Sequence, residues 1–123
     1  MLKQAKKRLP QGKVRLGDAA CIPFTDSTFD LVLIVDALHH FVDNKKTLQE
    51  TCRVLKDQGH LYVLDFNRHH TYIKILEKLE RCLGEKSVFL TPNQLVQLLW
   101  DTGFKSVNTL EPSSYEFLII AQK

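Results

Sequence analysis

The protein has 123 residues, of which 44% are apolar and 25% charged, a length and composition that suit one globular domain. The net charge is +3, and much of the positive charge lies within the first 15 residues. No aromatic residue interleaves these lysines and arginines, which is typical of a solvated helix face and argues against a nucleic-acid partner. No apolar run approaches the roughly 20 residues of a membrane span and no signal peptide is visible, so we expect a cytoplasmic protein with no membrane span.

The first predicted elements are a short helix and two strands. A helix over residues 2–9 ends at Pro10-Gln11-Gly12, and Val14–Leu16 is a short strand candidate. Residues 19–27 have the composition of a loop. Residues 29–35 are the clearest strand. Within them, residues 31–35 are all apolar and do not alternate with polar residues. Such a run predicts a strand covered on both faces, as in a parallel sheet flanked by helices.

Two amphipathic helices and a strand follow. Asp43 or Asn44 can cap a helix that runs to about Lys56, and Gly59 suits the left-handed position after it. Residues 60–66 are the next strand. Residues 71–83 form the second helix. Its apolar face is predicted to comprise Tyr72, Leu76, Leu79 and Leu83.

The last helix and two strands complete the pattern. Thr91, with Pro92 at the first helical position and Gln94 three residues after the cap, predicts a capping box. The side chains expected to pack inward from this helix are Leu95, Val96, Leu98, Leu99 and Trp100. Residues 105–110 and 115–121 are strands joined by a short connection, which predicts an antiparallel hairpin with the second strand interior. We therefore predict an α/β fold, a Rossmann-like mostly parallel sheet flanked by helices with a C-terminal antiparallel hairpin.

The three cysteines are Cys21, Cys52 and Cys82. Their number is odd, their spacing is wide and no CxxC occurs, so the pattern does not predict a disulfide framework. Each lies in an apolar context, which predicts buried free thiols in a reducing compartment.

Asp18 is the first candidate for a ligand contact, because it lies where a strand gives way to a loop. Ligands of open parallel sheets bind at the carboxyl ends of the strands. The Asp18 carboxylate could accept a hydrogen bond from a sugar hydroxyl or a base amino group, and the Ala19 N–H could donate to a ring nitrogen. Ile22 or Phe24 could pack on the face of a base. The equally weighted alternative is that Asp18 caps a turn.

Asp36, His39 and His40 are the candidates for proton chemistry. Asp36 directly follows the apolar strand, where a carboxylate can orient a substrate or act as a base, although a cap of a turn or helix is the simpler interpretation. Adjacent histidines in extended chain point to opposite sides and rarely share one metal, so we expect no metal site. A histidine that lines the pocket is one interpretation of the pair, and a merely hydrogen-bonded histidine is the more common one. His69 and His70 could also line this rim or lie in solvent.

The residues also carry a resemblance to a known family. No glycine-rich phosphate or cofactor loop occurs, but "GDAACIPFTDSTFDLVLIVDALHHF", "RVLKDQGHLYVLDF" and "TPNQLVQLLWDTGFKSV" are present. Together they resemble the second half of the class I S-adenosylmethionine-dependent methyltransferases, closest to the ubiquinone and menaquinone biosynthesis subgroup. "DQG" replaces the subgroup's usual "PGG". The resemblance covers nearly the whole chain, which we take as a single, truncated methyltransferase-like domain of residues 1–123.

The resemblance implies a fold, a cofactor and site residues. The sheet would have the order 3-2-1-4-5-7-6 with strand seven antiparallel, and the family's first strands and glycine-rich loop would precede Met1. The cofactor would be S-adenosylmethionine and the partner a small-molecule methyl acceptor. The residues implied to contact the cofactor are Gly17, Asp18, Ala19, Ile22, Val35 and Ala37. Asp36, His39 and His40 would serve the acceptor.

Two main functions follow as alternatives, and a third, weaker possibility is a nucleotide-binding domain that uses only the Asp18 side of the site. The first is S-adenosylmethionine-dependent methyl transfer to a small molecule. The second is a non-catalytic methyltransferase remnant that acts as an interaction module or needs a partner chain to complete the cofactor site. Because unpaired strand edges recruit other strands, the second alternative predicts a homodimer through the exposed flank of the sheet.

Overall fold

The structure is a computed structural model that describes residues 2–8, 12–84, 87–110 and 115–123. In chain order the elements are α1 (Leu2–Arg8), β1 (Phe29–Val35), the 3-10 helix η1 (Leu38–His40), α2 (Asn44–Val54), β2 (Leu55–Phe66), α3 (Thr71–Cys82), α4 (Pro92–Asp101), β3 (Ser106–Leu110) and β4 (Glu116–Gln122). The predicted elements are therefore confirmed, apart from the first strand.

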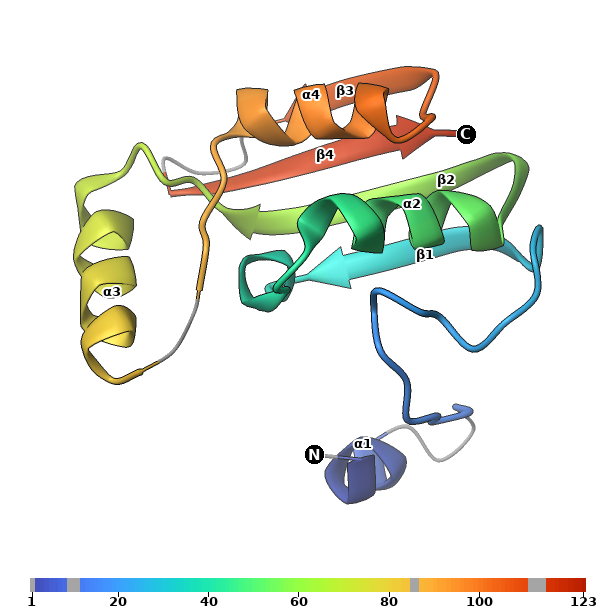
Figure 1. The fold of residues 1–123 in the computed structure, drawn as a ribbon, viewed down its shortest axis with the longest axis horizontal. Coiled ribbons are helices and arrows are strands. Elements are labelled where there is room, and N and C mark those ends of the chain that lie inside the picture. Colours follow the sequence, from blue (N-terminus) through green and yellow to red (C-terminus); the bar gives the residue numbers. More distant parts are fainter. Residues whose placement is uncertain (1, 9–11, 85–86, 111–114) are drawn as a thin grey trace.

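The sheet has four strands in the order β1-β2-β4-β3 (Figure 1). β1 and β2 are parallel, whereas β4 is antiparallel to both β2 and β3. The predicted hairpin and the interior position of its second strand are confirmed, and so is the α/β class. The described sheet is mixed, however, because two of its three strand pairs are antiparallel.

The hydrophobic core lies on one face of the sheet. α2 and α4 both pack on this face, as Figure 1 shows. Alternate residues of β2 and β4 point toward the helices, as the period of two in a strand requires. The fully buried side chains that meet there include Leu48, Leu61, Val63, Leu95, Leu99 and Ile119.

The opposite face of β1 is exposed, so the prediction that this strand is covered on both faces is wrong. Leu31, Leu33 and Val35 are 48%, 61% and 56% exposed. α2 and α4 are both on the other face, and no described helix covers these three side chains. The apolar run therefore correctly indicates a strand, but within the described residues only one face of that strand is covered.

The predicted strand at Val14–Leu16 does not form. A strand needs a neighbour for its backbone hydrogen bonds, and β1 and β3 are the edges of the described sheet with no pairing to residues 14–16. The only bridge in this segment of the described chain joins Asp18 and Cys21 across a turn.

The connection after α2 differs in detail from the prediction. Asp43 caps α2, since its carboxylate accepts a hydrogen bond from the Lys46 N–H at 2.9 Å. The left-handed residue after α2 is Gln58, with φ 63°, and not Gly59; it lies near the start of β2, where the pairing with β1 shifts register. Gly59 is needed for space instead, because a Cβ there would come within 2.8 Å of the Lys56 carbonyl oxygen.

α3 has the opposite orientation to the one predicted. Its buried residues are Ile73 and Glu77, while Tyr72, Leu79 and Leu83 are more than half exposed. α3 lies beyond the carboxyl ends of β1 and β2 and not on the sheet (Figure 1). The predicted apolar face of α3 therefore does not pack on the sheet, and the side that carries Ile73 and Glu77 faces the protein instead.

The capping box of α4 is confirmed in both directions, with Thr91 and Gln94 bonding each other's backbone. Leu95 and Leu99 are buried, but Trp100 is 48% exposed, because it lies a residue off the stripe that these leucines form. Of the cysteines only Cys52 is buried; Cys21 and Cys82 are exposed, which corrects the prediction for both. Within the described residues, no helix has the length and apolarity that crossing a bilayer requires.

Candidate functional site

The carboxyl ends of β1 and β2 bring the candidate acids and histidines together. These strands are parallel neighbours in which Val35 pairs with Leu64, so they end at the same rim. The Asp36 N–H donates to the Leu64 carbonyl oxygen at 2.9 Å and extends this pairing by one residue. η1 then turns the chain back over the end of β2 and places His39 beside Asp65.

His39 and Asp65 form a buried pair. The His39 Nδ1 lies 2.7 Å from Asp65 Oδ1, and the two side chains are only 5% and 4% exposed. The His39 backbone N–H also donates to Asp65 Oδ2 at 3.3 Å. Because the carboxylate accepts from Nδ1–H, it fixes the ring orientation and leaves Nε2 as the atom for other chemistry. The Phe89 ring stacks on His39 with a centroid distance of 4.4 Å.

The pKa of His39 is raised above its ordinary value of 6.5. Burial is the largest single influence and acts to lower this pKa, because it disfavours the charged ring. The hydrogen bond and the negative charge of Asp65 outweigh burial, with smaller help from Asp36 and Glu80. His39 therefore binds its proton more firmly in this site than a histidine exposed to water does.

Asp36 adds an exposed carboxylate in an unusual backbone conformation. Its φ is 48°, in the left-handed region, where Asp is one of the few residues that occurs with any frequency. Its Oδ1 lies 4.0 Å from His39 Nε2, and its side chain is 61% exposed. Strained residues of this kind cluster at functional sites, and this one displays a carboxylate at the free side of the His39 ring.

Asp36, His39 and Asp65 offer ligand atoms that all lie within 4.8 Å of one another, a spacing that a metal ion could bridge. The Nδ1 of His39 and Oδ1 of Asp65 are, however, already bonded to each other. The short bond accounts for the burial of both groups without an ion, so we interpret the cluster as a His–Asp pair with an adjacent carboxylate.

The "GDA" loop forms a second part of the site. Asp18 caps its own turn, as its Oδ1 accepts from the Ala20 N–H at 2.9 Å. Gly17, Asp18 and Ala19 line a pocket of about 710 Å³ together with His40 and the residues that start α2. They also line an adjoining hollow of about 270 Å³ that includes Ile22. One rim thus combines a carboxylate, backbone groups and apolar surface.

Arg53 of α2 fastens this loop to the helix. Its guanidinium donates to the carbonyl oxygens of Ile22 and Phe24 at 3.0 and 2.9 Å, and to Asp26 at 2.7 Å. Glu50 accepts from Arg53 and from the Ile22 N–H, which completes the clamp. The loop is therefore held although residues 14–16 form no strand.

The structure brings most, but not all, of the predicted site residues together. His40 shares the larger pocket with Gly17, Asp18 and Ala19, and Asp36 approaches His39. The two histidines do not point apart as expected for extended chain: η1 is helical, and their ring centroids are 4.0 Å apart. Val35 and Ala37 flank this rim without lining either hollow.

The sequence reasoning missed the partners of His39. Asp65 has no local signal beyond its place near the end of a predicted strand, and only the parallel pairing of β1 and β2 places it beside the residues that follow Asp36. Phe89 had no signal at all, because it reaches His39 from a segment far along the chain.

Comparison with known proteins gives this site its context. A family model described as a methyltransferase domain matches residues 1–63, about half of the chain. Demethylmenaquinone methyltransferase of Thermotoga maritima is 31% identical to the chain, with 85% of the chain and 56% of that protein covered. Ubiquinone/menaquinone biosynthesis C-methyltransferase UbiE of Francisella tularensis subsp. novicida is 43% identical, with 73% and 44% covered.

Solved structures agree in fold. A Thermotoga maritima S-adenosylmethionine-dependent methyltransferase, described as a possible histamine N-methyltransferase, superimposes with a TM-score of 0.85 over 100% of this chain and 69% of that one, at 24% identity. The chain belongs to the methyltransferase-domain family of class I S-adenosylmethionine-dependent enzymes and resembles its quinone-biosynthesis members. It spans about half the length of the curated relatives it matches.

Proposed function

We propose that this protein is an S-adenosylmethionine-dependent methyltransferase that acts on a small-molecule acceptor. The observation that carries the proposal is the pocket shared by the "GDA" loop and His40, in a chain that belongs to the methyltransferase family. When bound, S-adenosylmethionine supplies an electrophilic methyl group on a sulfonium sulfur. The task of the protein is then chiefly to orient the acceptor and accept its proton.

The residues of the "GDA" loop fit an adenosine. Asp18 Oδ1 is occupied by the Ala20 N–H, and Oδ2 has no hydrogen bond within the described residues, so it can accept from the exocyclic amino group of adenine. The N–H of Ala19 can donate to a ring nitrogen, and Ile22 offers an apolar surface to the purine face. Gly17 lets Pro23 pack closely against this loop, because a Cβ there would meet the Pro23 ring at 2.9 Å. Val35 and Ala37 are proposed to border the rest of the cofactor.

His39, Asp36 and His40 serve the acceptor in this proposal. Asp65 holds the His39 ring by Nδ1, which leaves Nε2 to hold the proton that the acceptor gives up. Asp36 lies beside Nε2 and stabilises the charged ring. His40 lines the pocket itself and contacts the acceptor, with its Nδ1 3.2 Å from the Ser87 hydroxyl.

Calorimetric titration of the purified chain tests the proposal. We expect S-adenosylmethionine and its demethylated product to bind, and Asp18→Asn to weaken both by about tenfold, the loss of one good hydrogen bond. Asp57→Asn removes the same charge from an exposed position near the start of β2 and is expected to bind as the wild type does. An absence of heat at millimolar ligand would exclude catalysis by this chain alone.

A second candidate function rests on the exposed face of β1. β1 is an edge strand, and Leu31, Leu33 and Val35 together present apolar surface. These features favour an interaction module that pairs with a second copy of the chain, which would contribute to a complete sheet. Size-exclusion chromatography with light scattering should then give a dimer that Leu33→Lys dissociates. A monomer at all concentrations would refute this candidate.

A further inference from the structure

A basic pocket lies between α3 and the start of α4. Its volume is about 560 Å³. Its lining comprises Arg68, His69, Lys74, Glu77, Lys78, Arg81 and Thr91. Four of these side chains are cationic and one is a carboxylate, so the formal charge of the pocket is +3 with His69 neutral.

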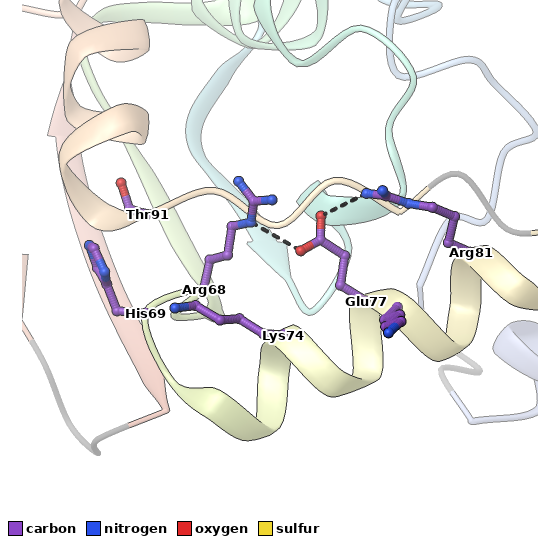
Figure 2. A pocket seen from close by; sticks show the side chains of 7 residues that line it. Arg68, His69, Lys74, Glu77, Arg81 and Thr91 are labelled. Atoms are coloured by element: carbon purple, nitrogen blue, oxygen red, sulfur yellow. Dashed lines mark hydrogen bonds and ion pairs between the residues drawn. The ribbon is translucent and has the colours of Figure 1, made fainter.

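The single carboxylate of the pocket is buried and holds two arginines. Glu77 has a side chain only 8% exposed, and its oxygens accept from Arg68 Nε at 3.0 Å and from Arg81 at 3.4 Å. Figure 2 shows the two guanidinium groups reaching Glu77 from opposite sides. A buried carboxylate is costly unless it is paired, so this arrangement fixes the arginines at the pocket wall. Each guanidinium retains N–H donors that Glu77 does not use.

The lysines of the pocket carry most of the uncompensated charge. Lys74 and Lys78 lie one turn apart on α3. Neither forms an ion pair within the described part of the chain. Two ammonium groups and two forked guanidinium groups around one cavity match the oxygens of a phosphate or a carboxylate.

The pocket adjoins the proposed transfer site. Arg68 follows Asp65 by three residues, as β2 leads into α3. Glu80 of α3 is close enough to act on the charge of His39. The segment before α4 joins the two sites as well, because the Val88 N–H donates to the His39 carbonyl oxygen at 2.7 Å and Thr91 lines the basic pocket.

We infer that this pocket binds an oxyanion, a phosphate or carboxylate group carried by the methyl acceptor. That the oxyanion belongs to the acceptor rests on the proposed function, whereas the presence of an anion site does not. The orientation of α3 fits this role, because the helix turns Glu77 and not its leucines toward the protein and so builds a charged wall.

The test is a titration of the isotope-labelled chain with inorganic phosphate, and separately with succinate, at constant ionic strength, followed by ¹⁵N–¹H correlation NMR. We expect saturable shifts confined to amides of residues 66–91. The double variant Lys74→Ala/Lys78→Ala should raise the phosphate dissociation constant about tenfold or more. The matched variant Lys6→Ala/Lys7→Ala removes two exposed charges from α1 and should titrate as the wild type does.

A second arm separates a soluble acceptor from one presented by a membrane. Flotation with phosphatidylglycerol-containing vesicles, against pure phosphatidylcholine, should show binding that depends on Lys74 and Lys78 only if the oxyanion belongs to a lipid headgroup. The inference is overturned if neither phosphate, succinate nor the anionic vesicles bind, or if the two double variants bind equally. Dispersed spectra of both variants establish that they fold, and loss of cofactor binding in the calorimetric titration would leave the anion site standing.

Discussion

Substitution of Asp65 by Asn should reverse the pH dependence that His39 imposes on stability. Asp65→Asn keeps the size of the side chain and an oxygen for the Nδ1–H, but removes the negative charge that offsets burial. Because burial is the largest influence on His39 and lowers its pKa, the pKa should fall below 6.5 in the variant. In the wild type it lies above 6.5.

The magnitude follows from the geometry of the pair. A 2.7 Å bond between side chains 5% and 4% exposed is a buried, charge-assisted hydrogen bond, and breaking such a pair costs about 3–5 kcal/mol while the histidine is charged. When His39 is neutral, the loss reduces to about 1–2 kcal/mol, because the amide oxygen of the substituted side chain still accepts one bond. The substitution should therefore destabilise the protein more when His39 is charged than when it is neutral. The difference should be about 1.4 kcal/mol for each unit by which the pKa of His39 falls.

The sign of the effect can be stated in advance. A raised folded-state pKa stabilises the wild type fully below pH 6.5, and this contribution disappears as the pH rises through the folded-state value. In the variant, stability should instead fall as the solution becomes more acid. Urea unfolding between pH 5 and 8 measures the difference, with Asp57→Asn as the control for loss of an exposed charge. NMR titration of the His39 ring gives the pKa directly; a value above 6.5 in the variant would refute the role of Asp65.

Three further predictions concern the fold. Leu61→Ala removes a fully buried side chain and should lower the free energy of unfolding by about 2–5 kcal/mol in urea denaturation, whereas an equal effect from an exposed leucine would contradict the one-sided core. Thr91→Ala breaks the capping box and should cost about 1 kcal/mol by the same assay, with Thr91→Ser restoring most of it. An aromatic disulfide reagent at pH 8 should modify Cys21 and Cys82 rapidly but Cys52 only on unfolding, because burial raises the pKa of the Cys52 thiol; fast reaction of all three would be inconsistent with the core.

Local chemistry in the sequence determined where most elements begin and end. The apolar run at residues 29–35 predicted β1, and Asp43 and Thr91 predicted the starts of α2 and α4. The short connection between the last two strands predicted their antiparallel pairing. These features depend on neighbours within a few residues, so a single sequence contains the information that they need.

Only the tertiary structure decided which faces are buried and which acids meet the histidines. The run at residues 31–35 has the same composition whether one or two layers cover it, and the stripe of α3 indicates an apolar face without saying what lies against it. The His39–Asp65 bond joins residues 26 positions apart, and the pairing of Glu77 with Arg68 depends on how α3 leaves β2. Such contacts are set by the parallel ends of β1 and β2 and by where the chain goes next, and these are properties of the packed fold and not of any local pattern.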